Sequence, residues 1–441
     1  MTRTSRWSVP LVFVALALLC TAAGADEIPT QPYITSADKI SAGDTAWMLS
    51  STALVLLMTI PGLALFYAGM VRQKNVLSTA LQSFAVCCLV TVLWVVIGYS
   101  LAFTPGSPLI GGFSRVLLSG MSYVKSTGAV SVSHIAPTIP ESVFVMFQMT
   151  FAIITPALIT GAFAERIKFG SMLLFMGLWS ILVYAPVAHA VWEPTGWLAA
   201  LGDQDFAGGT VVHINAGAAG LMCAFVLGKR SGYGREAFVP HNLTFTLIGA
   251  SLLWVGWFGF NAGSAVAADG RAGMAMLVTQ LATATASLTW MFVEWAFRKR
   301  ASLLGGCSGA VAGLVAITPA SGFVDVSGAL VIGVVAGGLC YWGATGLKRL
   351  LDADDSLDVF GIHGIGGIVG AILTGVFSRP DIAGAPADIA IQTLGAFATL
   401  FYSAAVSLVL LLAIKFTIGL RVSPEAEQLG LDLSQHGEKI P

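Results

Sequence analysis

The sequence predicts an all-α integral membrane protein in which eleven transmembrane helices form an inverted five-plus-five repeat with one extra helix. Of the 441 residues, 56% are hydrophobic and only 10% are charged, so a water-soluble core could not hide the apolar surface. Apolar runs of spanning length recur along the chain, and two similar histidine-containing stretches lie far apart in it. Composition, run length and this internal similarity together predict the fold class.

The chain begins with the features of a secretory signal peptide. Arg3 and Arg6 precede an apolar run, and Ala23-Gly24-Ala25 fits an A-x-A cleavage site. The mature chain is therefore expected to begin outside the cytoplasmic membrane. The predicted parts are a signal peptide (1–25), a transmembrane domain (26–421) and a C-terminal tail (422–441).

Eleven apolar runs follow, each long enough to cross a bilayer or nearly so. Their expected bounds are 45–70, 78–103, 141–163, 170–192, 207–227, 242–265, 273–297, 303–319, 326–346, 358–377 and 391–420. An odd number of spans places the two mature ends on opposite sides of the membrane.

Basic residues cluster in alternate loops between these runs, which the positive-inside rule assigns to the cytoplasm. The amino end is then outside and the tail inside, as expected for a multi-pass protein of the cytoplasmic (inner) membrane. The residues are Arg72, Lys74, Arg166, Lys168, Lys229, Arg230, Arg235, Arg298, Lys299, Arg300, Lys348, Arg349 and Arg421.

Glycine and alanine crowd the fifth span and the eighth to tenth, which predicts that these spans pack closely inside the bundle. The run 391–420 has no earlier counterpart, leaving two units of five spans. A five-span unit ends on the side opposite to its start, so the second unit must be inverted. His213 in the fifth span and His363 in the tenth then become symmetry mates near the midplane.

Each histidine follows an acidic residue and is surrounded by small residues, in the stretches 205–217 and 358–367. A single buried histidine is usually a hydrogen-bonded core residue, but the matched context favours a function. Burial favours the neutral imidazole, so the two rings could share a hydrogen bond and relay a proton. Asp205 and Asp358 are candidate helix N-caps; this is the preferred interpretation for Asp358, whereas Asp205 could also stabilise a cation that it does not touch.

Aromatic residues cluster near the outer depth of the third, fourth and sixth spans. An interfacial belt or simple packing explains such residues in general, and we accept it for Trp197 and Trp342. Phe147, Trp192 and Ser264 instead suit a cation site, where ring faces attract the ion and a hydroxyl accepts a hydrogen bond. Such a site favours a small cation with N–H donors.

Other classes of function find little support in the sequence. The six cysteines lie in apolar runs without a CxxC spacing, which favours packing thiols over a disulfide framework or a metal site. No nucleophile and base fall at a motif spacing, so we expect neither an enzyme nor a cofactor. No basic patch suits nucleic acid.

Five stretches resemble the ammonium transporter family (Amt, with the fungal Mep and animal Rh branches), and bacterial Amt proteins in particular. They are 59–69 (TIPGLALFYAG), 161–166 (GAFAER), 205–217 (DFAGGTVVHINAG), 256–264 (GWFGFNAGS) and 358–367 (DVFGIHGIGG). The resemblance implies an eleven-helix bundle with inverted repeats, assembled as a homotrimer with one pore in each subunit.

The resemblance also implies a role for each candidate residue. Phe147, Trp192 and Ser264 match the family's ammonium recruitment site, Phe151 and Phe260 its phenylalanine gate, His213 and His363 its twin histidines, and Asp205 its structural aspartate. The chain departs from the family at Glu193, where glycine is usual, and also carries an acidic residue at Asp203. Because of these two residues, the resemblance does not determine the shape and charge of the outer mouth.

The expected function is to recruit ammonium outside, remove its proton and conduct ammonia through a hydrophobic pore. The proton either returns outside or follows a separate wet route. One alternative is a gas channel of the Rh type, which Trp192 and Ser264 disfavour. Another is an ammonium sensor acting through a partner.

The tail after Arg421 is either a loose end or a docked segment. Ser423-Pro424 followed by Glu425 predicts a helix start, and Leu429, Leu431 and Leu433 suggest that the segment packs on something. The resemblance implies that the tail lies across the trimer and cooperates with the PII signal protein, whose loop plugs the inner mouth.

Overall fold

The computed structural model describes residues 29–440, so the predicted signal peptide lies outside the described residues. Ten helical segments are long and apolar enough to cross a membrane, and the shorter apolar helix α13 occupies the place of the eighth expected span. The predicted class is confirmed. The segments are α2–α3 (Ala42–Met70), η3–α5 (Gln73–Phe103, with α4 at Val76–Leu93), α6 with η6 (Glu141–Phe163), α7–α9 (Phe169–Leu201), η8–α10 (Gly209–Leu227), α11 (Leu243–Gly263), α12 (Gly270–Arg298), α13 (Leu303–Ile317), α14–α15 (Val326–Leu350), η10–α16 (Phe360–Phe377) and α18 (Ile389–Thr417).

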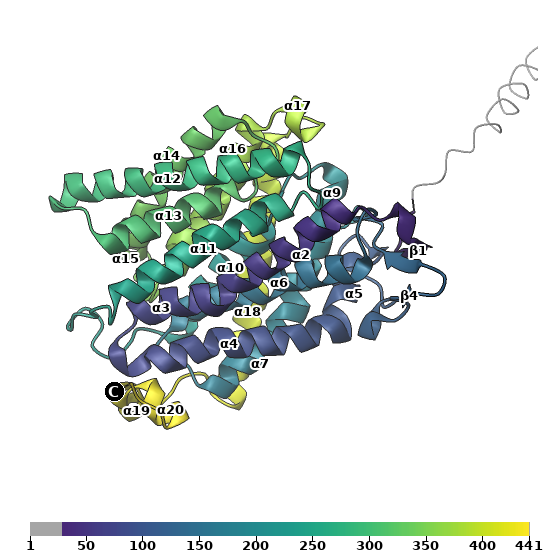
Figure 1. Cartoon of the computed structure of the whole chain (residues 1–441). Helices are drawn as coiled ribbons and strands as arrows, with labels where there is room; N and C mark the ends of the chain where they lie inside the picture. Colours follow the sequence, from purple (N-terminus) through teal and green to yellow (C-terminus); the bar gives the residue numbers. More distant parts are fainter. Residues whose placement is uncertain (1–28, 441) are drawn as a thin grey trace, which may run out of the picture.

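The two ends of the bundle differ, and we call them the sheet end and the tail end (Figure 1). At the sheet end, β1 (Tyr33–Ser36) and β4 (Tyr123–Val124) pair antiparallel with β5 (Ala129–Val132) in the order β1-β5-β4. A hairpin of β2 (Gly106–Ser107) and β3 (Ile110–Gly111) belongs to the same long connection after α5. The short helices α19 (Pro424–Leu429) and α20 (Leu431–His436) form the tail end, so the described chain starts and finishes at opposite ends.

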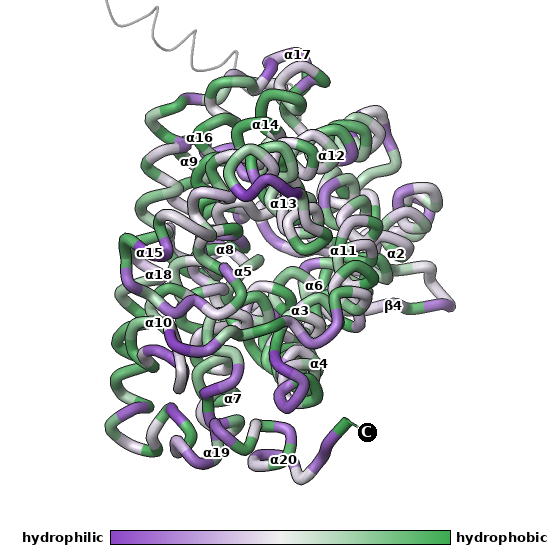
Figure 2. Tube along the Cα trace, turned by 90° about the vertical axis from the view of Figure 1, so that its left-hand side faces the viewer, coloured by the Kyte–Doolittle hydropathy of each residue, from purple (hydrophilic) through white to green (hydrophobic). Residues whose placement is uncertain are grey.

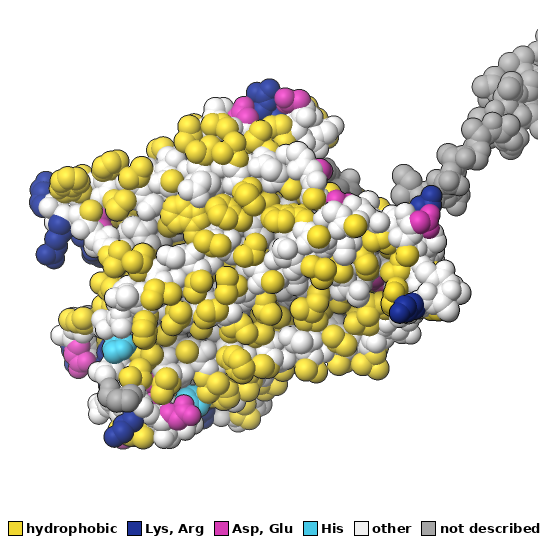
Figure 3. Space-filling model, in the orientation of Figure 1, with side chains coloured by type: hydrophobic (Ala, Val, Ile, Leu, Met, Phe, Trp, Pro, Cys, Tyr) yellow, Lys and Arg dark blue, Asp and Glu magenta, His cyan; other side chains and the backbone are white. Residues whose placement is uncertain are grey.

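The outer surface fits a lipid environment. Figure 3 shows hydrophobic side chains covering the middle of the bundle, while charged groups gather at its two ends. The view onto the tail end in Figure 2 shows hydrophilic stretches in the connections between helices. Large apolar residues such as Phe292 (59% exposed) and Phe401 (68% exposed) face outward, as expected where lipid replaces water.

Loops from distant parts of the sequence meet at the tail end through ion pairs. Arg72 pairs with Glu165 (2.6 Å), and Arg230 pairs with Asp354 (2.8 Å). The buried guanidinium of Arg166 donates to the carbonyl of Asp354 (2.6 Å). Basic loops that the sequence assigned to one side of the membrane are therefore tied together at one end of the bundle.

The tail docks on its own chain. Ser423 caps α19, as the sequence predicted, by accepting a hydrogen bond from the backbone of Ala426 (3.2 Å). Asp432 accepts the backbone N–H groups of Leu77 (3.1 Å) and Ser78 (2.7 Å) at the start of α4. Leu431 is buried. Two other leucines that suggested docking stay half exposed: Leu429 (54%) and Leu433 (46%).

Glycines allow the fifth and tenth expected spans to cross closely. A Cβ atom on Gly217 of α10 would lie 2.4 Å from the backbone nitrogen of Gly364 in η10 (Phe360–Gly364). A Cβ atom on Gly367 would lie 2.9 Å from the carbonyl oxygen of Gly209, where η8 (Gly209–Ile214) begins. Only residues without a side chain fit at such contacts. This crossing sets the distance between the two histidine-bearing segments.

Candidate functional site

Three phenylalanine rings form a continuous row that leads to a histidine. Phe147 contacts Phe151 edge to face with ring centroids 4.9 Å apart, and both come from α6. Phe151 stacks on Phe260 of α11 at 4.2 Å, and Phe260 faces His213 at 6.1 Å. Phe151 and Phe260 are almost completely buried, and their stacked rings leave little exposed surface at this point of the row.

The row ends at a contact between the two histidines. The Nδ1 atoms of His213 and His363 lie 3.3 Å apart, and the rings are tilted by 21° with centroids 5.3 Å apart. One Nδ1 must donate the hydrogen and the other must accept it, so both rings can be neutral with opposite tautomers. Nε2 of His213 is buried and makes no hydrogen bond to the described residues. This nitrogen is therefore available to a molecule in the pathway.

A hydrogen bond between two Nδ1 atoms also limits how many protons the pair can hold. If one ring gains a proton on its Nε2, its Nδ1–H can donate to the other Nδ1, which stays neutral. A second proton would place two Nδ1–H groups against each other. The geometry therefore suits a pair that accepts one additional proton and passes it on.

Trp192 and Ser264 lie beside the outer part of the row. Trp192 meets Phe151 edge to face at 5.8 Å, and its indole N–H donates to the carbonyl of Asp205 (2.8 Å). Ser264 follows α11, and its hydroxyl donates to the carbonyl of Phe260 (2.8 Å). Both side chains are partly exposed, whereas Phe147 is buried, so they could meet a ligand arriving from the sheet end.

Asp205 fixes the start of the segment that carries His213. One carboxylate oxygen accepts the backbone N–H groups of Gly208 (2.9 Å) and Gly209 (2.6 Å). The other accepts those of Thr210 (2.8 Å) and Val211 (3.0 Å). Burial raises the pKa of Asp205, and these four hydrogen bonds oppose that shift by stabilising the carboxylate. Asp205 thus caps the helix and also connects it to Trp192.

The N-cap interpretation of Asp358 is wrong. The Asp358 carboxylate pairs with Lys348 (2.8 Å), while Asp355 accepts the backbone N–H of Phe360 (2.8 Å) at the start of η10. Asp355 precedes His363 by eight residues, the same spacing that separates Asp205 from His213. The sequence suggested Asp358 as the N-cap because this residue stands directly before the apolar run. In the structure, the side chain of Asp358 faces Lys348, and the carboxylate of Asp355 takes the capping position instead.

Glu193 and Asp203, the acidic residues expected to affect the shape and charge of the outer mouth, both have buried carboxylates. Glu193 is fully buried, where it accepts the backbone N–H of Thr195 (2.6 Å) and lies 3.1 Å from Nε2 of His134. Neither carboxylate oxygen of Asp203 has a hydrogen-bond partner among the described residues. Burial, together with the nearby charge of Asp205, raises the pKa of Asp203 well above its usual range. Neither residue adds an exposed negative charge near Trp192.

The sequence prediction of the site omitted Trp257, although this residue lies in the stretch 256–264 on which the resemblance rests. Its ring stacks on His213 with centroids 5.3 Å apart, and its indole N–H donates to the hydroxyl of Thr318 (2.8 Å). Trp257 precedes Phe260 by three residues on α11, so the two share one helix face. This spacing was the available signal.

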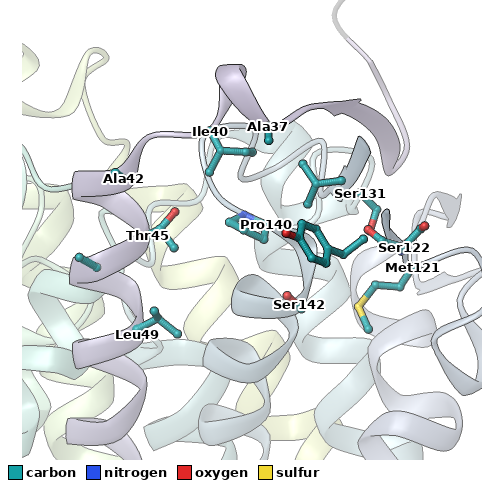
Figure 4. A pocket seen from close by; sticks show the side chains of 13 residues that line it. Ala37, Ile40, Ala42, Thr45, Leu49, Met121, Ser122, Ser131, Pro140 and Ser142 are labelled. Atoms are coloured by element: carbon teal, nitrogen blue, oxygen red, sulfur yellow. The ribbon is translucent and has the colours of Figure 1, made fainter. Parts of the chain in front are cut away.

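A pocket of 660 Å³ at the sheet end contains none of these residues. It lies between the start of α2, the small sheet and the start of α6 (Figure 4). Its lining includes Ile40, Thr45, Leu49, Met121, Tyr123 and Pro140. The row of rings is therefore a separate feature, built inside the bundle.

Comparisons with known proteins agree on one family. Residues 46–440 match the family model described as Ammonium Transporter Family. An ammonium transporter of Bacillus subtilis is 48% identical over 406 residues, which cover 90% of this chain and 98% of that protein. The crystal structure of Candida albicans Mep2 is similar, with a TM-score of 0.82 at 36% identity and 91% of each chain covered. A solved structure titled Sensor Amt Protein has a TM-score of 0.81 at 27% identity, covering 89% of this chain and 98% of the other.

Replacing Asp205 with alanine should destabilise the protein, because four backbone N–H groups lose their acceptor in a buried place. Each unsatisfied group costs about 1–3 kcal/mol before relaxation. The thermal unfolding midpoint of the purified protein should fall. Asp203→Asn is the matched control and should leave the midpoint unchanged or raise it, since its oxygens have no partners. Equal midpoints for the two variants would contradict the capping role of Asp205.

Proposed function

The chain belongs to the ammonium transporter family, and from that membership we propose how it moves its substrate. Ammonium is recruited at Phe147, Trp192 and Ser264 and loses its proton. Ammonia then passes the gate of Phe151 and Phe260 and crosses beside His213 and His363. The observation that carries this proposal is the unbroken row of rings that ends at the contact between the two histidine Nδ1 atoms.

The energetics favour deprotonation over passage of the intact ion. Moving an ion into an apolar interior without compensation costs on the order of tens of kcal/mol. Removing a proton from ammonium, whose pKa lies about two units above neutral, costs only about 3 kcal/mol at pH 7. Potassium has no proton to lose, so an apolar pathway rejects it although its size is similar.

Recruitment rests on cation-π attraction and one hydrogen-bond acceptor. The partly exposed ring of Trp192 and the hydroxyl of Ser264 lie at the outer end of the row, where an arriving ion would still be partly hydrated. Asp205 binds the indole N–H through its backbone carbonyl and would supply a negative charge nearby. The charge would then stabilise the cation without touching it.

The histidine pair would handle protons while ammonia passes. Ammonia could accept a hydrogen bond from Nε2 of His213 or donate one to it, depending on the tautomer. The proton released at the outer site either returns outside, giving net ammonia flux, or travels separately to the cytoplasm, giving net charge transfer.

A second candidate function is sensing through a partner protein. One structural neighbour is titled Sensor Amt Protein, and the tail of this chain is docked against its inner loops. Arg421 joins the tail to this end by pairing with Glu427 (2.7 Å), which also accepts the backbone N–H of Ser231 (2.7 Å). We propose that a PII-type signal protein binds this surface, either to regulate transport or to receive the signal.

The assembly and location follow from the same resemblance. We propose a homotrimer with one pathway in each subunit, inserted in the inner membrane with the sheet end outside and the tail end in the cytoplasm. The gathering of Arg72, Arg166, Arg230 and Arg421 at the tail end supports this orientation through the positive-inside rule.

His213→Ala and His363→Ala should each lower ammonium uptake by about 100-fold, the scale on which a positioned proton-transfer group acts. The fold should survive, because the close contact of Gly217 with Gly364, which joins the two segments, does not involve the imidazole rings. Uptake by proteoliposomes measures the effect. His241→Ala is a control on a histidine outside the row. If either variant kept the wild-type flux and the wild-type discrimination against potassium, the proposal that the histidines relay a proton would be contradicted.

Trp192→Leu should weaken recruitment without blocking the pathway. The lost ring face contributes about 0.5–2 kcal/mol, so the half-saturating concentration should rise about 2- to 30-fold. Saturation of methylammonium uptake provides the measurement. Trp197→Leu is the matched control, since that side chain lines a separate pocket with Pro186 and Tyr402. Identical saturation curves for Trp192→Leu and the wild type would argue against a cation site.

Removing every residue after Arg421 should lower uptake and weaken PII binding about tenfold, a loss of about 1.4 kcal/mol. The reason is that Glu427 and Asp432, which hold inner loops, are lost with the tail. Asp432→Asn is a milder control that keeps the chain length. Pull-down of PII and uptake assays test both effects. Normal insertion, transport and PII affinity after truncation would leave the tail without a functional role.

A further inference from the structure

Two cavities at the tail end share a wall made by one ion pair. The larger, of 350 Å³, opens between α12, α13 and α14 and includes Tyr233, Glu294 and Arg298 in its lining; we call it the inner vestibule. The smaller, of 10 Å³, lies against the start of η10 and is lined by Gly343, Phe360 and Gly361 among others. Lys348 and Asp358 line both.

Asp355 also lines the smaller cavity, with one carboxylate oxygen unused. Its side chain is 3% exposed. Oδ2 accepts the backbone N–H of Phe360, whereas Oδ1 is buried and has no hydrogen-bond partner among the described residues. A buried polar atom without a partner is costly unless it has a use or meets a water molecule. The cavity is close to the size of one water molecule.

Asp205 and Asp355 hold equivalent places but have different chemistry. Both precede a histidine by eight residues and accept a backbone N–H at the helix start. Each oxygen of Asp205 accepts two backbone N–H groups, and all four hydrogen bonds favour the charged carboxylate. Oδ1 of Asp355 accepts none and is free to bind a proton.

We propose that Asp355 is the inner proton acceptor of a route separate from the path of ammonia, leading from His363 through the small cavity and past Asp358 into the inner vestibule. The inference rests on the proposed function, because it assumes that the histidine pair carries the proton. An N–H bond of the imidazolium breaks as an O–H bond forms on Asp355. That O–H bond then breaks and the proton passes to water in the vestibule, which restores the carboxylate.

The surroundings of Asp355 suit this exchange. Burial raises its pKa to about 6, Lys348 opposes the rise and Asp358 adds to it. A group that titrates near neutral pH both accepts and releases a proton readily. Asp355 accepts the backbone N–H of Phe360, which lies three residues before His363, within one turn of the same helical segment. The other titratable or charged groups that sense the charge of Asp355 are Arg166, Tyr67 and Cys223.

The test compares two signals from the full-length protein reconstituted in lipid: uptake of labelled ammonium into liposomes and the current evoked by an ammonium pulse. Asp355→Asn should lower the charge moved per ammonium about 100-fold, because the amide cannot take up the proton. Asp355→Glu keeps a carboxylate and should restore most of the current. Glu294→Gln is the matched control, since this carboxylate lines the vestibule but not the small cavity.

Asp358→Asn is an independent variant that keeps the test possible if Asp355→Asn does not fold. The side chain of Asp358 is 34% exposed, so its substitution should be tolerated. It should also lower the ratio of current to uptake. An unchanged ratio of current to uptake in the folded Asp355 and Asp358 variants would overturn the route. Ammonium uptake by the wild-type protein without any current would overturn it as well. Absence of ammonium uptake by the wild type would instead contradict the proposed transport function.

Discussion

The contact between His213 and His363 is the constraint on which the rest of the structure depends. Two segments 150 residues apart must approach until their Nδ1 atoms lie 3.3 Å from each other. That approach requires Gly217 against Gly364, because a single methyl group would collide with the backbone. The aromatic row, the capping aspartate and the inner cavities are all arranged around these two segments.

The carboxylates at the two helix starts explain how a symmetric scaffold could support a directional process. Both oxygens of Asp205 accept backbone N–H groups, which favours the carboxylate form near the site where a cation would arrive. Asp355 keeps one oxygen free and has a pKa of about 6, which suits a group that changes its charge. Similar positions therefore carry different electrostatic properties in the outer and inner halves.

Much of the fold follows from local properties of the sequence. Apolar run length predicts the helical segments, although α13 has only 15 residues and qualifies as a span only in its context. Matched small residues predict that His213 and His363 meet. The cap at Asp355 was missed because its role depends on where the backbone turns into η10, and the small sheet was missed because its strands have two to four residues. The stacking of Trp257 on His213 depends on tertiary packing, which a single sequence does not specify.

The central claim is that the substrate crosses as ammonia after losing a proton. Its most direct test is uptake by proteoliposomes supplied with equal concentrations of labelled ammonium and potassium, with both followed inside. The account predicts that nitrogen accumulates while potassium stays outside, because potassium has no proton to release. Entry of potassium at a rate comparable to that of ammonium would show that an intact cation crosses, and would contradict the account.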